Sequence, residues 1–185
     1  MTGLPDLYLM RHGQTVWNAE GRLQGRMDSP LTALGRHQAR RQAQLVRGID
    51  AARYASNAGR AVETAGIVYG GQDFRQDARL HEIDIGAFTG RTWPDLCAAH
   101  PEITSGGWLD WYDHAPGGEL FAGVEARARG FLADLSGPAL IVTHGITLRM
   151  LRLIAMDLPL TRLGEMPVMQ GALHVISGGQ HRMVL

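Results

Sequence analysis

The chain has 185 residues, which is enough for one domain with a substantial core. Its 18 basic and 18 acidic side chains give a net charge of zero, so there is no overall electrostatic basis for binding nucleic acid or anionic membranes. The single Cys97 excludes an internal disulfide and a cysteine zinc site, and it predicts a reducing, cytoplasmic environment. Because arginine supplies all 18 basic side chains and lysine is absent, Schiff-base lysine chemistry is excluded and any phosphate must be bound by arginine.

The amino-terminal stretch MTGLPDLYLMR is unlike a secretion signal, because Asp6 interrupts its apolar part and no basic region precedes it. No later segment approaches about 18 uninterrupted apolar residues, the length that suggests a membrane-spanning helix. We therefore expect a protein that is neither secreted nor inserted into a membrane.

Short apolar runs alternate with longer helical patterns along the chain, which predicts an α/β domain. The clearest strands are DLYLMR at 6–11 and PALIVT at 138–143, because each is short, apolar on both faces and followed by a turn that contains glycine. Weaker strand candidates lie at 52–57, 172–177 and 181–185.

Four segments carry the apolar spacing of helices, and they lie at 31–48, 56–68, 118–135 and 146–154. Thr32 is the expected N-cap of the first helix and Gly48 its expected stop, while Ser56 or Asn57 is expected to cap the second. The expected buried stripes of the other helices are Ala61, Ala65 and Val68; Leu120, Val124, Phe131 and Leu135; and Ile146, Met150, Leu153 and Ile154. Between 86 and 118 the pattern gives way to glycine, proline and tryptophan, which predicts an elaborated loop or a cap of short helices.

Two histidines occupy matching positions at the ends of the two clearest strands, in LMRHG and IVTHG. Ligands of doubly wound sheets bind beyond the carboxyl ends of the strands, so His12 and His144 are expected to meet in one crevice. Arg11 disfavours a charged imidazole beside it, which leaves His12 as a neutral nucleophile, base or metal ligand. The alternative is that each histidine merely ends a strand and bonds a loop carbonyl.

Arg60 and Glu82 are two further candidates for the same site. Arg60 in SNAGRAVETA lies in the first turn of a predicted helix, where a guanidinium and free helix amides form an anion site; the alternative is an exposed helical arginine. Glu82 in RLHEIDIGAFTG follows a possible strand, and Gly86 permits a tight turn after it. Taken alone, Glu82 would be interpreted as a solvated carboxylate.

The series RHGQT with Asn18, RLQGRMDSPLTALGRHQA, SNAGRAVETA, LHEIDIGAFTG, PGGE and VTHG, in this order and spacing, resembles the histidine phosphatase superfamily. That family includes cofactor-dependent phosphoglycerate mutases and many small phosphatases. The resemblance covers nearly the whole chain and implies a phosphoglycerate mutase-like fold, a three-layer α/β/α sandwich with a mostly parallel central sheet. It also implies one domain over 1–185 with a cap-like insertion around 86–118.

The resemblance implies roles for particular residues. His12 would attack phosphorus and become phosphohistidine, Arg11, Arg60 and His144 would bind the phosphate, and Glu82 would donate the proton. Nearby arginines favour an ionised Glu82, and we expect a bound phosphate dianion to offset their charge. The positions implied to contact phosphate or substrate are Asn18, Gln24, Gly25 and Gly145. Two departures from the family pattern are Glu63, where glutamine is common, and Leu120, where serine is common.

The expected function is hydrolysis of a small phosphorylated metabolite through phosphohistidine on His12, without a metal or other cofactor. The alternatives are a cofactor-dependent phosphoglycerate mutase and a non-catalytic phosphate-binding module. A mutase must shield phosphohistidine from water, and the mutases of the family are typically longer. A metal hydrolase is disfavoured because Arg11 and Arg60 would place fixed positive charge beside a divalent cation.

The substrate is poorly specified by the sequence. Trp108, Trp111 and Tyr112 lie within the expected cap, where they would either stack on a substrate ring and restrict access or form the cap's own small core. Sugar phosphates, nucleoside monophosphates and a cobalamin-precursor phosphate all fit. The protonation state of His144 and the oligomeric state are left open.

Overall fold

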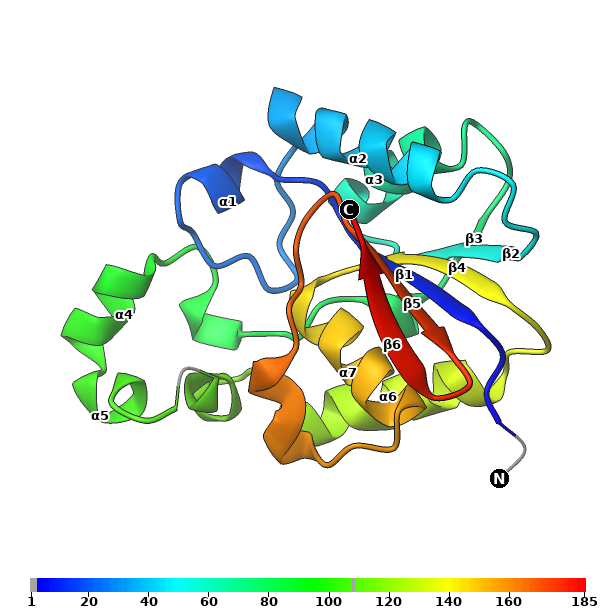
Figure 1. The fold of residues 1–185 in the computed structure, drawn as a ribbon. Coiled ribbons are helices and arrows are strands. Elements are labelled where there is room, and N and C mark those ends of the chain that lie inside the picture. Colours follow the sequence, from blue (N-terminus) through cyan, green and yellow to red (C-terminus); the bar gives the residue numbers. More distant parts are fainter. Residues whose placement is uncertain (1–2, 108) are drawn as a thin grey trace.

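A six-stranded sheet forms the centre of the computed structural model, which describes residues 3–107 and 109–185 (Figure 1). The strands run in the order β3-β2-β4-β1-β5-β6. Their bounds are β1 Leu7–Arg11, β2 Ala52–Ala55, β3 Arg75–Gln76, β4 Ala139–Thr143, β5 Leu173–Ser177 and β6 Gln180–Val184. All five predicted strands are therefore present, and the short β3 is an addition that its sequence does not predict.

The sheet is mostly parallel. The strands β3, β2, β4 and β1 pair in parallel, whereas β5 pairs antiparallel with β1 and β6 closes the sheet as the second arm of a hairpin. β1 and β4 lie side by side in the middle, with Leu7 opposite Ala139 and Arg11 opposite Thr143. The two histidines that follow these strands are thereby brought to one edge of the sheet.

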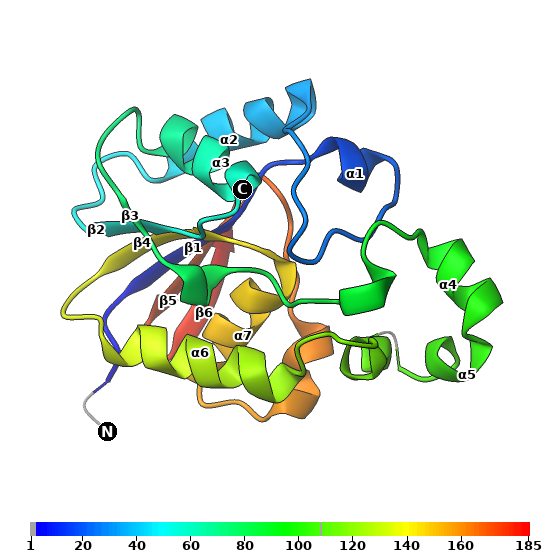
Figure 2. The same ribbon diagram turned by 180° about the vertical axis from the view of Figure 1, so that it is seen from behind.

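Helices cover both faces of the sheet, as the two opposite views show (Figures 1 and 2). One face is covered by α2 (Ala33–Leu45) and α3 (Gly59–Val68), the other by α6 (Phe121–Ala133) and α7 (Gly145–Ala155). This confirms the three-layer α/β/α sandwich. No helix in the part of the chain that the structure describes is long and apolar enough to cross a bilayer.

Several short helices lie beyond the edge of the sheet at which β1 and β4 end (Figures 1 and 2). They are α1 (Val16–Ala19), α4 (Trp93–Ala99) and α5 (Pro101–Thr104). Turns of 3-10 helix occur at Ala78–Leu80, Gly86–Phe88, Asp110–His114 and Leu160–Glu165. The segment 86–118 thus consists mainly of short helices beside the carboxyl ends of the strands.

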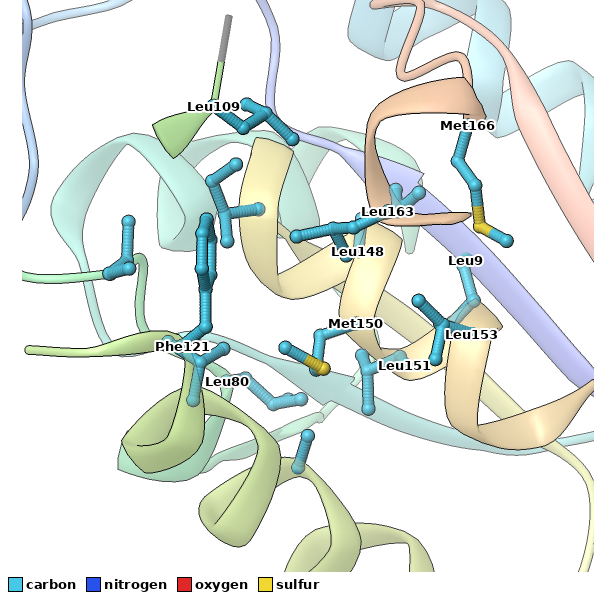
Figure 3. Close-up of a cluster of buried hydrophobic side chains, with 14 of the residues drawn as sticks. Leu9, Leu80, Leu109, Phe121, Leu148, Met150, Leu151, Leu153, Leu163 and Met166 are labelled. Atoms are coloured by element: carbon cyan, nitrogen blue, oxygen red, sulfur yellow. The ribbon is translucent and has the colours of Figure 1, made fainter. Parts of the chain in front are cut away.

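Two apolar clusters, one on each side of the sheet, form the core. Side chains alternate between the faces of a strand, so Leu9 of β1 belongs to one cluster and Met10 to the other. Ile141 and Val142 of β4 divide in the same way. The larger cluster, under α6 and α7, includes Phe121, and Figure 3 shows it. Burial on both faces explains why these two strands carry apolar side chains on both faces.

Three expectations about the helices are corrected by the structure. Thr32 does cap α2, since its hydroxyl accepts the Gly35 N–H at 3.0 Å, but the helix ends at Leu45 and Gly48 lies in the turn beyond. The α3 cap predicted at Ser56 or Asn57 is wrong, because Ala58 is the N-cap residue and no side chain caps the helix. Leu120 was expected in the buried stripe of α6, yet it precedes the helix and is 53% exposed.

The backbone of the loop after β1 and the backbone of the first turn of α2 approach each other closely. A Cβ atom on Gly13 would lie 2.2 Å from the carbonyl oxygen of Gly35 in α2, and one on Gly35 would lie 2.1 Å from the Gln14 carbonyl oxygen. Neither contact leaves room for a methyl group. The two glycines therefore allow the first turn of α2 to hold the loop that begins at His12.

We predict that Gly35→Ala lowers the free energy of unfolding by about 1–3 kcal/mol, because the backbone must shift to admit the methyl group. The control is Gly66→Ala inside α3, where a Cβ would meet nothing within 4 Å. We expect that change to be neutral or to stabilise by about 0.4–1 kcal/mol through the unfolded chain. Urea denaturation of the two variants measures both values, and equal stabilities would contradict the close approach.

Candidate active site

The two histidines meet at the carboxyl ends of β1 and β4. The backbone N–H of His12 donates to the Thr143 carbonyl at 2.9 Å, which continues the pairing of the two strands by one residue. The ring centroids of His12 and His144 lie 5.2 Å apart, and the rings are 3% and 0% exposed, respectively. The predicted convergence is therefore present, and neither histidine merely ends its strand.

The hydrogen bonds of His12 determine which ring nitrogen is reactive. Nδ1 lies 2.8 Å from the Gly13 carbonyl oxygen, and since a carbonyl only accepts, Nδ1 carries the proton. Nε2 therefore holds the lone pair, and it accepts the Nε–H of Arg60 at 3.3 Å. Burial first, then Arg60 and then Arg11 hold the pKa of His12 well below its ordinary value, so the ring is neutral. Arg11 contributes as the sequence suggests, but burial and Arg60 are the larger causes.

The Arg60 guanidinium is fixed by protein acceptors. Arg60 is 2% exposed, and its terminal nitrogens donate to the carbonyls of Met27 at 2.7 Å and Gly25 at 2.8 Å and to Asp28 Oδ1 at 3.1 Å. Gly25 has a φ of +49°, which favours glycine at this carbonyl. Asp28 also accepts the backbone N–H of Arg60 at 3.2 Å, so it holds both the helix start and the side chain. The alternative of an exposed helical arginine is wrong.

Arg11 supplies the second cation of the site. Its Nη1 donates to the Val168 carbonyl at 3.4 Å, and its buried Nε has no hydrogen-bond partner among the described residues. Gly145 lies beside this group, since a Cβ there would be in ordinary van der Waals contact, 3.8 Å from Arg11 Nε and 3.4 Å from Glu82 Oε2. A buried N–H without an acceptor suits an anionic ligand.

The secondary structure that precedes Glu82 differs from the predicted strand. Glu82 follows the 3-10 helix at Ala78–Leu80 and not a strand. Its carboxylate accepts the backbone N–H groups of Ile146 at 3.1 Å and Thr147 at 3.2 Å, in the first turn of α7. The carboxylate is thus bound by backbone N–H groups at the amino-terminal end of a helix. Nothing in the sequence around Glu82 indicates this partnership.

His144, the N-cap residue of α7, is fully buried. Its Nε2 lies 2.7 Å from the Ser56 hydroxyl, and its Nδ1 has no partner among the described residues. The ring of His81 stacks on it, with centroids 5.6 Å apart. Burial, followed by the charge of Arg60, holds the pKa of His144 well below its ordinary value. The imidazole is therefore neutral, which resolves the question that the sequence left open.

A cavity of about 110 Å³ opens onto His12 and the arginines beside it, whereas His144 and Gly145, also predicted for the site, are not among its lining residues. The predicted residues that line it are Arg11, His12, Asn18, Gln24, Gly25, Arg60 and Glu82, and Arg22 lines it as well. Asn18 Oδ1 accepts from Thr15 N–H and from Gln170 Nε2, so its amide N–H groups are left for a ligand. Larger cavities of about 490 and 500 Å³ lie elsewhere, but neither contains this set of histidines and arginines.

Two aromatic residues of the segment 86–118, Trp111 and Tyr112, lie beside the cavity and also pack within the segment. Trp111 and Tyr112 both line the cavity and stack on each other with ring centroids 3.8 Å apart. Trp111 also packs against Phe88 and Trp93, so it belongs to the small core of this segment. Trp108 lies outside the described residues.

Ion pairs occur at or beside both residues that depart from the family pattern. Glu63 pairs with Arg36 of α2 at 2.9 Å, on the surface and away from the cavity. Beside Leu120, the carboxylate of Glu119 pairs with Arg127 of α6 at 2.8 Å and with Arg26 at 3.3 Å. Neither departure removes a group from the cavity.

Positive charge dominates the cavity, where Glu82 is the one acidic residue beside Arg11, Arg22 and Arg60. Among the described residues, no group of three or more histidine, cysteine, aspartate or glutamate side chains is arranged to hold a metal ion. Two fixed guanidinium groups and a neutral imidazole with an available lone pair are suited to an oxyanion such as a phosphate group.

Comparison with known proteins agrees with this geometry. The model of the histidine phosphatase superfamily (branch 1) matches residues 7–185. YhfR from Bacillus stearothermophilus is 35% identical with a TM-score of 0.81, and the match covers 98% of this chain and 96% of that one. The alpha-ribazole phosphatase from Shigella flexneri is 28% identical with a TM-score of 0.83, over 97% and 95% of the two chains.

A probable phosphoglycerate mutase, GpmB from Enterobacter sp. strain 638, is 36% identical over 168 residues, which cover 83% of this chain and 76% of the relative. The matches thus include proteins named as phosphatases and as mutases. The resemblance noted in the sequence is confirmed along almost its full length, and the chain belongs to branch 1 of the histidine phosphatase superfamily.

Proposed function

We propose that this protein hydrolyses a small phosphorylated metabolite through a phosphohistidine formed on Nε2 of His12. The observation that carries the proposal is the neutral His12 ring, whose Nε2 lone pair lies 3.3 Å from the Arg60 guanidinium. A nucleophile held beside a fixed cation can attack a phosphoryl group that the same cation binds. No metal takes part, because the arginines supply the positive charge.

In the first step, Nε2 of His12 bonds to phosphorus as the bond to the ester oxygen breaks. Arg60 Nε transfers its hydrogen bond from Nε2 to a phosphoryl oxygen, and the unpartnered Arg11 Nε–H binds another. Charge spread over these oxygens in the transition state is thereby stabilised. In the second step, water attacks phosphorus, the bond to Nε2 breaks, and inorganic phosphate leaves.

Glu82 handles the proton in both steps. The negative phosphate offsets the arginines and allows the carboxyl group to be protonated, and the acid then gives its proton to the leaving alkoxide oxygen. The carboxylate that results is stabilised by the N–H groups of Ile146 and Thr147. In the second step the same carboxylate takes a proton from the attacking water.

Access of solvent favours water as the acceptor. Arg22 lines the cavity, and its side chain is 45% exposed, so the cavity reaches the surface. A mutase has to exclude water while phosphohistidine waits for a hydroxyl acceptor. Similarity to a solved alpha-ribazole phosphatase over 97% of the chain supports the same choice, whereas the probable phosphoglycerate mutase relative supports the alternative.

The first test concerns the nucleophile. Rapid mixing with nitrophenyl phosphate and a denaturing quench should trap phosphate on His12 as an adduct that is stable to alkali and labile to acid. His12→Ala should abolish the adduct and lower turnover by roughly three orders of magnitude or more. His37→Ala, at an exposed position of α2, is the control and should retain both. A non-catalytic binding module would form no adduct, and an adduct on another residue would contradict the mechanism.

The second test separates the acid from the phosphate pocket. Glu82→Gln should slow sugar phosphates by about 10²–10⁴-fold but nitrophenyl phosphate much less, because the nitrophenolate needs little protonation. Glu63→Gln, which removes a carboxylate on the surface, should leave both rates unchanged. Steady-state kinetics measures the four rates, and equal losses on both esters would assign Glu82 to substrate positioning alone.

The third test identifies the acceptor. Given 3-phosphoglycerate and a catalytic trace of 2,3-bisphosphoglycerate, the enzyme should release inorganic phosphate or leave the substrate unchanged. It should not accumulate 2-phosphoglycerate, because water reaches the phosphohistidine. Phosphorus NMR distinguishes inorganic phosphate, 2-phosphoglycerate and unchanged 3-phosphoglycerate. Rapid interconversion of the two phosphoglycerates would establish the mutase alternative.

A further inference from the structure

Ser56 and His144 form a buried pair at the ends of two neighbouring strands. Ser56 follows β2 and His144 follows β4, and the Ser56 N–H donates to the Val142 carbonyl at 2.9 Å. Both residues are 0% exposed, and Ser56 Oγ lies 2.7 Å from Nε2 of His144. The direction of this short hydrogen bond decides which nitrogen of His144 carries the proton.

The partners of Ser56 determine that direction. Its Oγ already accepts the Ala58 N–H at 3.3 Å, and within the described residues its other partner is Nε2 of His144. If Nε2 donated, both the buried hydroxyl proton and the Nδ1 lone pair would lack a partner among the described residues. If the hydroxyl donates, Oγ and Nε2 are both satisfied. The imidazole is neutral, so its single proton then lies on Nδ1.

Nδ1 of His144 is itself buried and has no hydrogen-bond partner within residues 3–107 and 109–185. The same is true of Arg11 Nε, and both atoms belong to residues that flank the nucleophile in the structure. Two buried N–H donors in one site without an acceptor among the described residues indicate that a bound ligand supplies the acceptors. The oxygens of a phosphate group meet that requirement.

We propose that Ser56 is a positioning residue that fixes the Nδ1–H tautomer of His144, and that this N–H donates to a phosphoryl oxygen. The second half rests on the proposed function, whereas the first half concerns the free protein only. A neutral donor of this kind strengthens its hydrogen bond as charge develops on the oxygen, and it needs no proton from solvent. Ser56 would then act on the reaction only through His144.

The tautomer can be read directly in the free protein. Long-range proton–nitrogen correlation NMR on histidine-labelled protein, with His144→Gln for assignment, should show a protonated Nδ1 and an unprotonated Nε2. In Ser56→Ala this preference should weaken or reverse, and Ser56→Thr, which keeps the hydroxyl, should restore it. A protonated Nε2 in the unaltered protein, or a charged ring, would overturn the assignment even if Ser56→Ala failed to fold.

Inorganic phosphate tests the donor. Added to the unaltered protein, it should shift the Nδ1 resonance of His144, and the absence of a shift despite phosphate binding would overturn the second half of the proposal. Ser56→Ala should lower kcat for nitrophenyl phosphate about 10- to 100-fold, as loss of a histidine-orienting partner does elsewhere, with rescue by Ser56→Thr.

Ser29→Ala is the matched control, since it removes another buried hydroxyl, which accepts the Trp17 N–H and touches no histidine. It should leave the His144 resonances and kcat unchanged, and an equal loss of kcat would assign the Ser56 effect to general packing. The NMR assignment stands apart from the reaction type. If the protein proves to be a mutase or a binding module, the predicted tautomer is still tested by the same spectra.

Discussion

The burial of Arg60 beside two histidines is the constraint on which this site depends. A buried guanidinium costs free energy unless it is fully hydrogen-bonded, and here Met27, Gly25 and Asp28 supply the acceptors. Because these partners lie on one loop, the turn after α1 has to hold its shape for the cation to keep its place. The charge so fixed, together with burial, keeps both imidazoles neutral and available.

The first turn of α7 organises the opposite side of the site. His144 is its N-cap residue, and the amides of Ile146 and Thr147 hold the carboxylate of Glu82. A helix start is a site for negative charge, and the protein fills this one with its own acid. The phosphate is therefore left to the arginines and the histidines, and the first turn of α7 holds the acid in place beside them.

The parts of this structure that follow from local pattern could be predicted from the sequence. Burial on both faces gives β1 and β4 apolar side chains on both faces, and parallel pairing then brings His12 and His144 together. The missed features depend on partners that are distant in the chain. Asp28 binds Arg60, and Ser56 binds His144 where a helix cap was expected, and neither contact leaves a periodic signal. Leu120 was misplaced because spacing alone does not show where a helix begins.

The in-register pairing of β1 with β4 also has a consequence for how the chain folds. The partner of Leu7 is Ala139, so the central contact of the sheet joins segments that are 132 residues apart in the chain. Contacts of this kind form slowly, since a long loop has to close before they stabilise anything. During synthesis, a nascent chain that already contains His12, Arg60 and Glu82 still lacks the strand between β1 and β2. The neighbours of β1 are β4 and β5, so β1 stays unpaired until β4 emerges, and its exposed apolar side chains favour aggregation up to that stage.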